Sequence, residues 1–390
     1  MRSTRYSTSR QKACNHCVAA KAKCDRTPGR CRRCAHRDLS CVYAHIPSAS
    51  QSDQDPDGAD PGAGRVTEPA PVPPTTTGPG HAADALALAL DFSDLGLTCP
   101  INPDDIANRW LNSFVPLPGQ TTKNYTPSLS AFMHRVLKSY ANCSIRGNKV
   151  PPFIHWSQLT LPSSLPLSTC LSVIRICDNP FPGTEEVAAE VLQREMTKLY
   201  DRRSSLDDVG LLAAFQAHLI YAMVIFFCLG QGCHSFLREA MINTQELACA
   251  ASRRGLVCEA EQRGARPRWE AWVAAEAKRR TLFAMCMFDS ALLTHDGFPS
   301  HLATELRGLP APASKALWEA RDRRTWEAKY NFHLSEFAGV GLCIDELWPI
   351  PDDFGEPEIA KRRGRVDAWL EDLDEYGTMI YAVTSCTHGT

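Results

Sequence analysis

The chain has 390 residues, enough for one to three domains, and 44% hydrophobic with 22% charged side chains is ordinary for a soluble protein. The formal net charge of −2 hides an uneven distribution, because residues 1–45 carry eleven basic and only two acidic side chains. The rest of the chain carries 31 basic and 42 acidic side chains. A small basic module attached to an acidic body predicts a polyanionic partner for the module alone.

Cysteine is abundant, with 17 residues, and six of them lie between Cys14 and Cys41. The first ten residues, MRSTRYSTSR, lack the apolar core of a secretory signal, so we expect a reducing compartment. In such a compartment, clustered thiols indicate a metal site rather than disulfides. The scattered cysteines, such as Cys143, Cys228 and Cys286, are expected to be reduced, buried, small hydrophobic side chains.

The clustered cysteines form a repeat, in which CNHCVAAKAKC is followed seventeen residues later by CRRCAHRDLSC. Zinc prefers four thiolate or imidazole ligands in a tetrahedron, so two zinc ions need eight ligand positions. Six cysteines supply eight positions only if two of them bridge both metals, and His16 and His36 are then expected to be surface residues. In each half, a tight CxxC turn would present two sulfurs and a short helix would return the third. The predicted ligands of two Zn²⁺ ions are Cys14, Cys17, Cys24, Cys31, Cys34 and Cys41.

This pattern resembles the fungal zinc binuclear cluster family of transcription factors, and the resemblance covers residues 12–43. In that family the first and fourth cysteines bridge the two metals, which implies bridging roles for Cys14 and Cys31. The family's base-reading lysine corresponds to Lys21, and its basic residue before the third cysteine corresponds to Lys23.

The resemblance implies double-stranded DNA with CGG-type triplets as the partner. A short helix carrying Lys21 could enter the major groove and donate hydrogen bonds to guanine O6 and N7. The arginines would contact phosphates and position the module without reading sequence. Many family members carry arginine or lysine at Val18, Ala19 and Ala20, so this chain should make fewer phosphate contacts. The predicted DNA-contacting residues are Lys21, Lys23, Arg26, Arg30, Arg32 and Arg33.

The family implies a nuclear, zinc-dependent regulator of RNA polymerase II genes that works with the transcription machinery, more as an activator than as a repressor. The stretch AAKAKC resembles members that control secondary-metabolite gene clusters. The alternative is a protein–protein adaptor that uses the zinc module as an interaction surface. Dimerisation stays open, because residues 46–81 contain no apolar heptads. The chain would bind DNA as a monomer or form a homodimer through its body.

Three segments are predicted: a zinc module at residues 1–45, a disordered linker at 46–81 and an all-α regulatory domain at 82–390. The linker has eight Pro and five Gly among 36 residues and cannot form a core. The body shows helical periodicity without convincing strand alternation. The predicted helices and their apolar faces are Glu185–Arg202 (Val187, Val191, Leu192, Met196, Leu199), Phe236–Ala251 (Leu237, Met241, Thr244, Ala248, Ala251) and Trp269–Asp289 (Trp269, Trp272, Val273, Arg280, Phe283, Met287).

Two segments of the body permit more than one interpretation. Val209–Gly230 is long enough to span a bilayer. However, it has Gln216 and His218 in its middle, and its flanks lack a one-sided positive charge. These features favour a buried central helix and no membrane partner. Residues 82–97 alternate acidic residues and leucine. This pattern favours a short helix docked on the body over an acidic-hydrophobic strip that recruits transcription machinery.

The body also carries the pattern Trp269-x2-Trp272-Val273-x2-Glu276-x2-Arg279-Arg280-Thr281, followed by Asp289. It resembles the regulatory middle homology region of the same fungal factors, which implies an all-helical domain that regulates activity. Glu276 and Arg280 are predicted to form a structural salt bridge, at the helix surface or semi-buried, in preference to an effector site. HExxH, GxSxG and P-loop motifs are missing from the sequence, so an enzyme is not expected.

Overall fold

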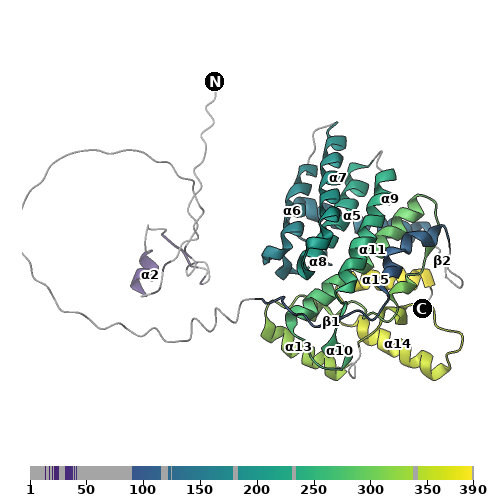
Figure 1. Cartoon of the computed structure of the whole chain (residues 1–390). Coiled ribbons are helices and arrows are strands. Elements are labelled where there is room, and N and C mark those ends of the chain that lie inside the picture. The colour runs from purple at the N-terminus through teal and green to yellow at the C-terminus, as the bar shows by residue number, and fades with distance from the viewer. Residues whose placement is uncertain are drawn as a thin grey trace, which may run out of the picture. The chain divides into compact units, whose positions relative to one another are not determined.

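The chain divides into two compact units, residues 1–78 and residues 79–390 (Figure 1). The predicted linker lies outside the part of the chain that the computed structural model describes. The described residues are 14, 17, 20, 22–25, 31–37, 39, 41, 90–115, 122–123, 125–178, 183–230, 234–336 and 341–388.

Among its described residues, the N-terminal unit has a core of sulfur rather than hydrocarbon. Its described helix, α2 (Arg32–His36), begins directly after Cys31 and contains Cys34, so the helix includes the second CxxC instead of following it as predicted. Leu39 N donates to Cys34 O at 3.0 Å at the end of this helix. The cysteines that are completely buried are Cys14, Cys17, Cys31 and Cys34.

The two halves of this unit repeat one backbone feature. Ala22 N donates to Cys17 O at 2.9 Å, and Leu39 N donates to Cys34 O at 3.0 Å. Both bonds span five residues, and their donors and acceptors are seventeen residues apart in the sequence. The sequence repeat is therefore also a structural repeat.

The larger unit is mostly helical, as predicted (Figure 1). Its α-helices are α4 (Pro103–Ala107), α5 (Pro127–Arg146), α6 (Leu165–Val173), α7 (Glu185–Asp201), α8 (Asp208–Val224), α9 (His234–Arg253), α10 (Glu259–Gln262), α11 (Trp269–His295), α12 (Lys315–Trp318), α13 (Arg323–Glu336), α14 (Glu356–Leu370) and α15 (Glu375–His388). Short 3-10 turns lie at Arg109–Ser113, Trp156–Thr160, Pro162–Ser164, Ile174–Cys177, Arg203–Ser205, Thr304–Leu306 and Ile344–Leu347.

Helix α8 is the centre of the fold, and α5, α6, α7, α9 and α11 pack against it (Figure 1). It continues as a π-helix at Ile225–Leu229. This combined helix has the length and apolarity to cross a membrane, yet its side chains are buried inside the unit. The predicted buried central helix is therefore present.

The polar residues within α8 are satisfied by hydrogen bonds in the core. Gln216 Nε2 donates to Phe153 O at 2.9 Å, and Gln216 Oε1 accepts from Gln158 Nε2 at 2.9 Å. His218 Nδ1 lies 2.8 Å from Thr244 Oγ1. Buried polar groups with partners cost little, which explains how this core accommodates them.

The strands are too short to leave an alternating sequence signal. In the described parts of the body, β1 (Leu97–Thr98) pairs antiparallel with β3 (Val257–Cys258), and β2 (Thr122–Lys123) with β4 (Ser300–His301). Gly255, with φ +91°, lies where β1 approaches, and a Cβ there would fall 2.3 Å from Leu97 Cβ. Only glycine permits this approach.

The predicted helix over residues 82–97 is wrong for residues 90–97, and residues 82–89 lie outside the described part. Asp91 Oδ1 accepts from Ser93 N at 2.9 Å and Asp94 has φ +43°, which turns the chain. Arg268 binds the carbonyl oxygens of this segment, so a tertiary contact competes with helix formation. The predicted docking is confirmed, because a core cluster contacts Leu90, Phe92, Leu95 and Leu97.

The predicted apolar faces have mixed outcomes. All five residues assigned to the face of α9 are buried. In α7, Leu192 and Met196 are buried, but Val187 is 60% exposed and Ala188 and Ala189 face the core instead. Small side chains allow a close approach of helices, a preference that apolar periodicity alone does not reveal. The one-sided face predicted for α11 is wrong, because the helix is buried on all sides from Trp269 to Ser290.

Two buried histidines should make the free energy of unfolding depend on pH. Burial lowers the pKa of His155 and of His218 to about 3. An unfolded chain takes up these protons near pH 6.5, so stability should fall as pH drops from about 6.5 to 3, by up to ~1.4 kcal/mol per pH unit for each histidine. Urea unfolding at several pH values should therefore show that His218→Gln loses less stability per pH unit than the wild-type protein. A slope equal to wild type would contradict this, and exposed His295→Gln is the control.

Candidate metal centre and nucleic-acid interface

The six cysteines of the N-terminal unit gather into two groups of four. Within each group all sulfur atoms lie within 4.8 Å of one another. Cys14 and Cys31 belong to both groups, which is the sharing that the sequence resemblance implied. Cys17 and Cys24 complete one group, and Cys34 and Cys41 complete the other.

The sulfur spacings fit zinc. The Sγ–Sγ distances are 3.8 Å for Cys14–Cys31, 3.7 Å for Cys14–Cys34 and for Cys17–Cys31, and 3.9 Å for Cys14–Cys24. Four sulfurs around zinc at about 2.3 Å form a tetrahedron with edges of about 3.8 Å. Disulfide sulfurs are only about 2.05 Å apart, and the described cysteines are free thiols. Two groups sharing two sulfurs therefore fit two Zn²⁺ ions.

The surroundings of the sulfurs also suit a metal. Burial raises the pKa of the Cys14 and Cys34 thiols, so thiolates at these positions need a compensating cation. Bound zinc would supply that positive charge and tie the two halves together. The protein adds donors of its own, because Cys31 N donates to Cys41 Sγ at 3.2 Å and Arg33 Nη1 donates to Cys17 Sγ at 3.9 Å.

The predicted DNA-contacting residues are only partly described. Lys23 is exposed, and the side chain of Arg32 is 90% exposed with its Nε 3.9 Å from Asp25 Oδ2. Arg33 is half-buried against the sulfurs rather than free in solvent. His36 is exposed, as expected. The residues that lie outside the described part are Lys21, Arg26, Arg30 and His16.

Sequence reasoning overlooked Asp25. Its carboxylate accepts a hydrogen bond from Arg32 N at 3.2 Å, at the start of α2. Asp25 thereby connects the end of the first half of the repeat with the helix of the second half. Its place directly after Cys24 was the available signal, but a bond across seven residues has no local pattern.

In the body, the predicted pair Glu276–Arg280 is present, with Arg280 Nε 2.7 Å from Glu276 Oε1. Its predicted location at the surface or semi-buried is wrong, because both side chains are completely buried. Arg279 Nη2 donates to Glu276 Oε2 at 2.8 Å, and Arg280 also pairs with Asp374. Burial raises the pKa of Glu276, but the attraction of both arginines outweighs it, and the pKa lies below its ordinary value.

Comparison with known proteins identifies the domain type of the N-terminal unit. Residues 12–50 match the family model of the fungal Zn(2)-Cys(6) binuclear cluster domain. Neither a curated protein nor a solved structure matches the chain. The domain, with six clustered cysteines that fit two Zn²⁺ ions, implies a zinc-dependent, DNA-binding transcription regulator. This class of protein is non-enzymatic, and it implies a place in the nucleus.

Proposed function

We propose that this protein binds CGG-type triplets in duplex DNA through its zinc cluster and thereby regulates transcription by RNA polymerase II. The observation that carries the proposal is the pair of four-sulfur groups sharing Cys14 and Cys31, inside the matched segment. In this proposal residues 1–45 bind DNA, residues 46–81 act as a linker and residues 82–390 regulate the activity. All six clustered cysteines act as zinc ligands, with Cys14 and Cys31 bridging.

The asymmetry of the repeat supports one DNA-facing half. Seventeen residues after Lys21 and Lys23, the second half has Asp38 and Ser40. An acidic side chain repels phosphate, whereas lysines attract it and can donate to guanine. The first half would therefore enter the major groove, with Lys21 reading bases and Lys23 beside it.

The arginines would hold the backbone on either side of that contact. Arg32 is exposed and available to a phosphate. Arg33 uses Nη1 for Cys17, and a guanidinium has further N–H donors for a phosphate oxygen. The proposed phosphate contacts are Arg26, Arg30, Arg32 and Arg33.

Replacing Lys21 by alanine is expected to remove about 1–3 kcal/mol of preference for a CGG duplex over a scrambled one, roughly 5- to 150-fold. Arg32→Ala should instead weaken binding to both duplexes alike and reduce the log–log salt slope by about one. Fluorescence anisotropy titrations at several salt concentrations, with zinc content checked first, measure both effects. A zinc-loaded Lys21→Ala protein that keeps its triplet preference would contradict the assignment.

Selection from a pool of random duplexes would identify the bound sequence. The number and spacing of enriched triplets would distinguish a monomer from a homodimer. A zinc-loaded protein that enriches no sequence at low salt would favour the alternative function, a protein–protein adaptor using the same module.

The class of target genes is a finer proposal. The stretch AAKAKC preceding Asp25 supports control of a secondary-metabolite gene cluster, with the protein acting as an activator together with the transcription machinery. Transcript levels after deletion of the gene test this, because an activator's targets fall and a repressor's targets rise.

A further inference from the structure

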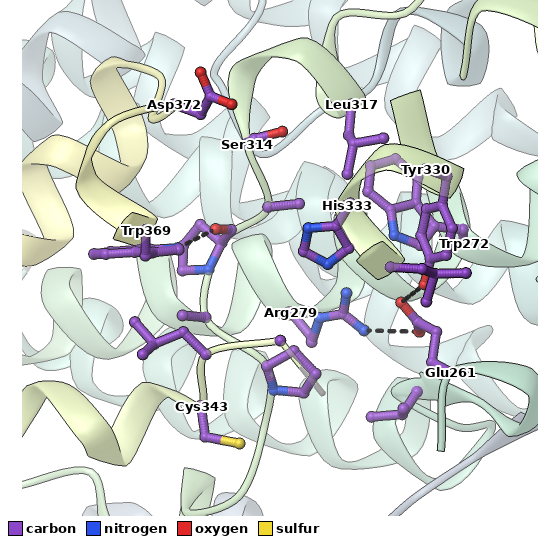
Figure 2. Close-up of a pocket in the computed structure, with 18 of the residues that line it drawn as sticks. Glu261, Trp272, Arg279, Ser314, Leu317, Tyr330, His333, Cys343, Trp369 and Asp372 are labelled. Carbon is purple, nitrogen blue, oxygen red and sulfur yellow. Dashed lines mark hydrogen bonds and ion pairs between the residues drawn. The ribbon is translucent and has the colours of Figure 1, made fainter. Parts of the chain in front are cut away.

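The helical unit contains a cavity of about 530 Å³ (Figure 2). It lies among α11, α13, the segment 308–317 and the end of α14. Small-molecule sites in proteins typically have volumes of about 300–1,000 Å³. The cavity has the size of a ligand site, and its described lining residues all belong to this unit.

Most of the described wall is apolar. Most of the large side chains are aromatic or aliphatic, and Figure 2 shows several of them around the space. Trp369 Nε1 donates to Pro312 O at 2.9 Å, so its indole N–H is already satisfied and its ring offers an apolar surface. The principal apolar residues are Trp272, Leu317, Tyr330, Leu342 and Trp369.

The charged Arg279 side chain in the wall is held by partners within the protein. Arg279 is 2% exposed, and its Nη1 and Nη2 donate to Leu256 O and to Glu276, each at 2.8 Å. Its Nε is buried, and among the described residues it has no hydrogen-bond partner. Because protein atoms enclose Nε, this arginine presents no free donor to the cavity.

The other polar groups argue against a charged ligand. Glu261 accepts a hydrogen bond from the Tyr330 hydroxyl at 3.1 Å and lies 3.8 Å from Arg279. Asp372 and Lys329 add one charge of each sign to the described lining. The acidic and basic groups balance, so neither an anion nor a cation is favoured.

We propose that this cavity is a binding site for a neutral, largely apolar small molecule. Aromatic rings of such a ligand would pack against Trp272, Tyr330 and Trp369. No residue of the zinc cluster is among the described lining residues.

Benzophenone, a neutral diaryl ketone, is a direct probe, because its excited carbonyl group inserts into nearby C–H bonds. Irradiation of the full-length, zinc-loaded protein followed by peptide mass spectrometry is expected to give saturable crosslinks within the lining segments 308–317, 328–334 and 341–343. Crosslinks scattered over the surface, or proportional to probe concentration without saturation, would overturn the proposal.

The chain offers matched variants for this test. A Cβ at Gly341 would meet only His333 Nε2, at 3.8 Å, so Gly341→Leu adds bulk to the cavity wall without a clash. A Cβ at Gly364 would meet nothing within 4 Å, outside the cavity lining, so Gly364→Leu is the matched control. We expect Gly341→Leu to reduce specific crosslinking at least tenfold and Gly364→Leu to leave it unchanged.

A second variant keeps the test decisive if Gly341→Leu fails to fold. Ala316 also lines the cavity and is half-buried, so Ala316→Leu narrows the space from another wall. Circular dichroism identifies which variants remain folded. Unchanged crosslinking in a folded Gly341→Leu or Ala316→Leu protein would contradict the site. DNA binding is not part of the readout, so failure of the proposed function would leave this result intact.

Discussion

Replacement of Cys31 by serine is expected to cost the protein both zinc ions and its DNA binding. Cys31 is the sulfur that, together with Cys14, belongs to both four-sulfur groups, so its loss removes a ligand from each metal. Structural zinc supplies roughly 10–16 kcal/mol of apparent binding free energy in small zinc domains, and that binding is coupled to folding. The core of the N-terminal unit is sulfur, and the described residues offer little hydrocarbon to replace it.

Zinc content after gel filtration, measured by inductively coupled plasma mass spectrometry, checks this result. Cys24→Ser removes a ligand from one group only and should retain more zinc than Cys31→Ser. Cys386→Ser changes an exposed thiol in the other unit and should retain two zinc ions. Two zinc ions in Cys31→Ser would show that the shared sulfur is dispensable.

Metal removal by a strong chelator should affect the two units differently. DNA binding should be lost, while the helical circular dichroism should change little, because the helical unit has its own hydrocarbon core. Collapse of the helical signal on chelation would contradict an independent core.

The second large effect is expected from Glu276→Gln in the helical unit. Both carboxylate oxygens of Glu276 are engaged, by Arg279, by Arg280 and by Ala313 N at 2.8 Å. Removing one partner of a buried ion pair leaves an uncompensated charge and typically costs about 3–5 kcal/mol. Arg280 retains Asp374, but the remaining carboxylate near Arg279 among the described residues is that of Glu261, 3.8 Å away.

Urea unfolding of the helical unit measures this cost. Glu259→Gln is the matched control, because Glu259 pairs with Arg263 at the exposed surface and should cost less than about 1 kcal/mol. The pKa of Glu276 is lowered in the folded state, so its contribution is present above the pKa of the unfolded chain and disappears as pH falls through the lower folded value. Equal stability losses in the two variants would contradict the role assigned to Glu276.

The buried network explains why the body tolerates a charged stretch inside its core. Arg280 also donates to Ala313 O at 3.0 Å and lies over the Trp318 ring, 4.4 Å from its centroid. The Tyr376 hydroxyl donates to Arg280 O. One arginine thus connects α11 to the 313 segment and to α15, so the network fixes the positions of elements far apart in the sequence.

Repeated or periodic features could be predicted well. The zinc cluster depends on spacing within 28 residues, and two short repeats of three cysteines leave few ways to arrange the sulfurs. Helix α9 has a regular apolar stripe, and all five of its predicted core residues are buried. These predictions succeed because neighbours in the chain determine the geometry.

Predictions that depended on partners elsewhere in the chain were less accurate. Residues 90–97 are held by Arg268 and form no helix. Val187 faces solvent, whereas Ala188 and Ala189 of α7 are buried. The pattern around Glu276 was correctly predicted to form an ion pair, but its complete burial depends on α11 lying inside the unit.

The amino-acid sequence by itself determined the zinc cluster, the class of protein and the central apolar helix, because each is encoded in local spacing or in one continuous segment. Only the tertiary structure decided the buried ion network and the cavity beside Arg279. Their residues come from segments far apart in the sequence, from Pro100 to Asp374. Such sites arise when distant segments pack together, and no local pattern in a single sequence records which segments will meet.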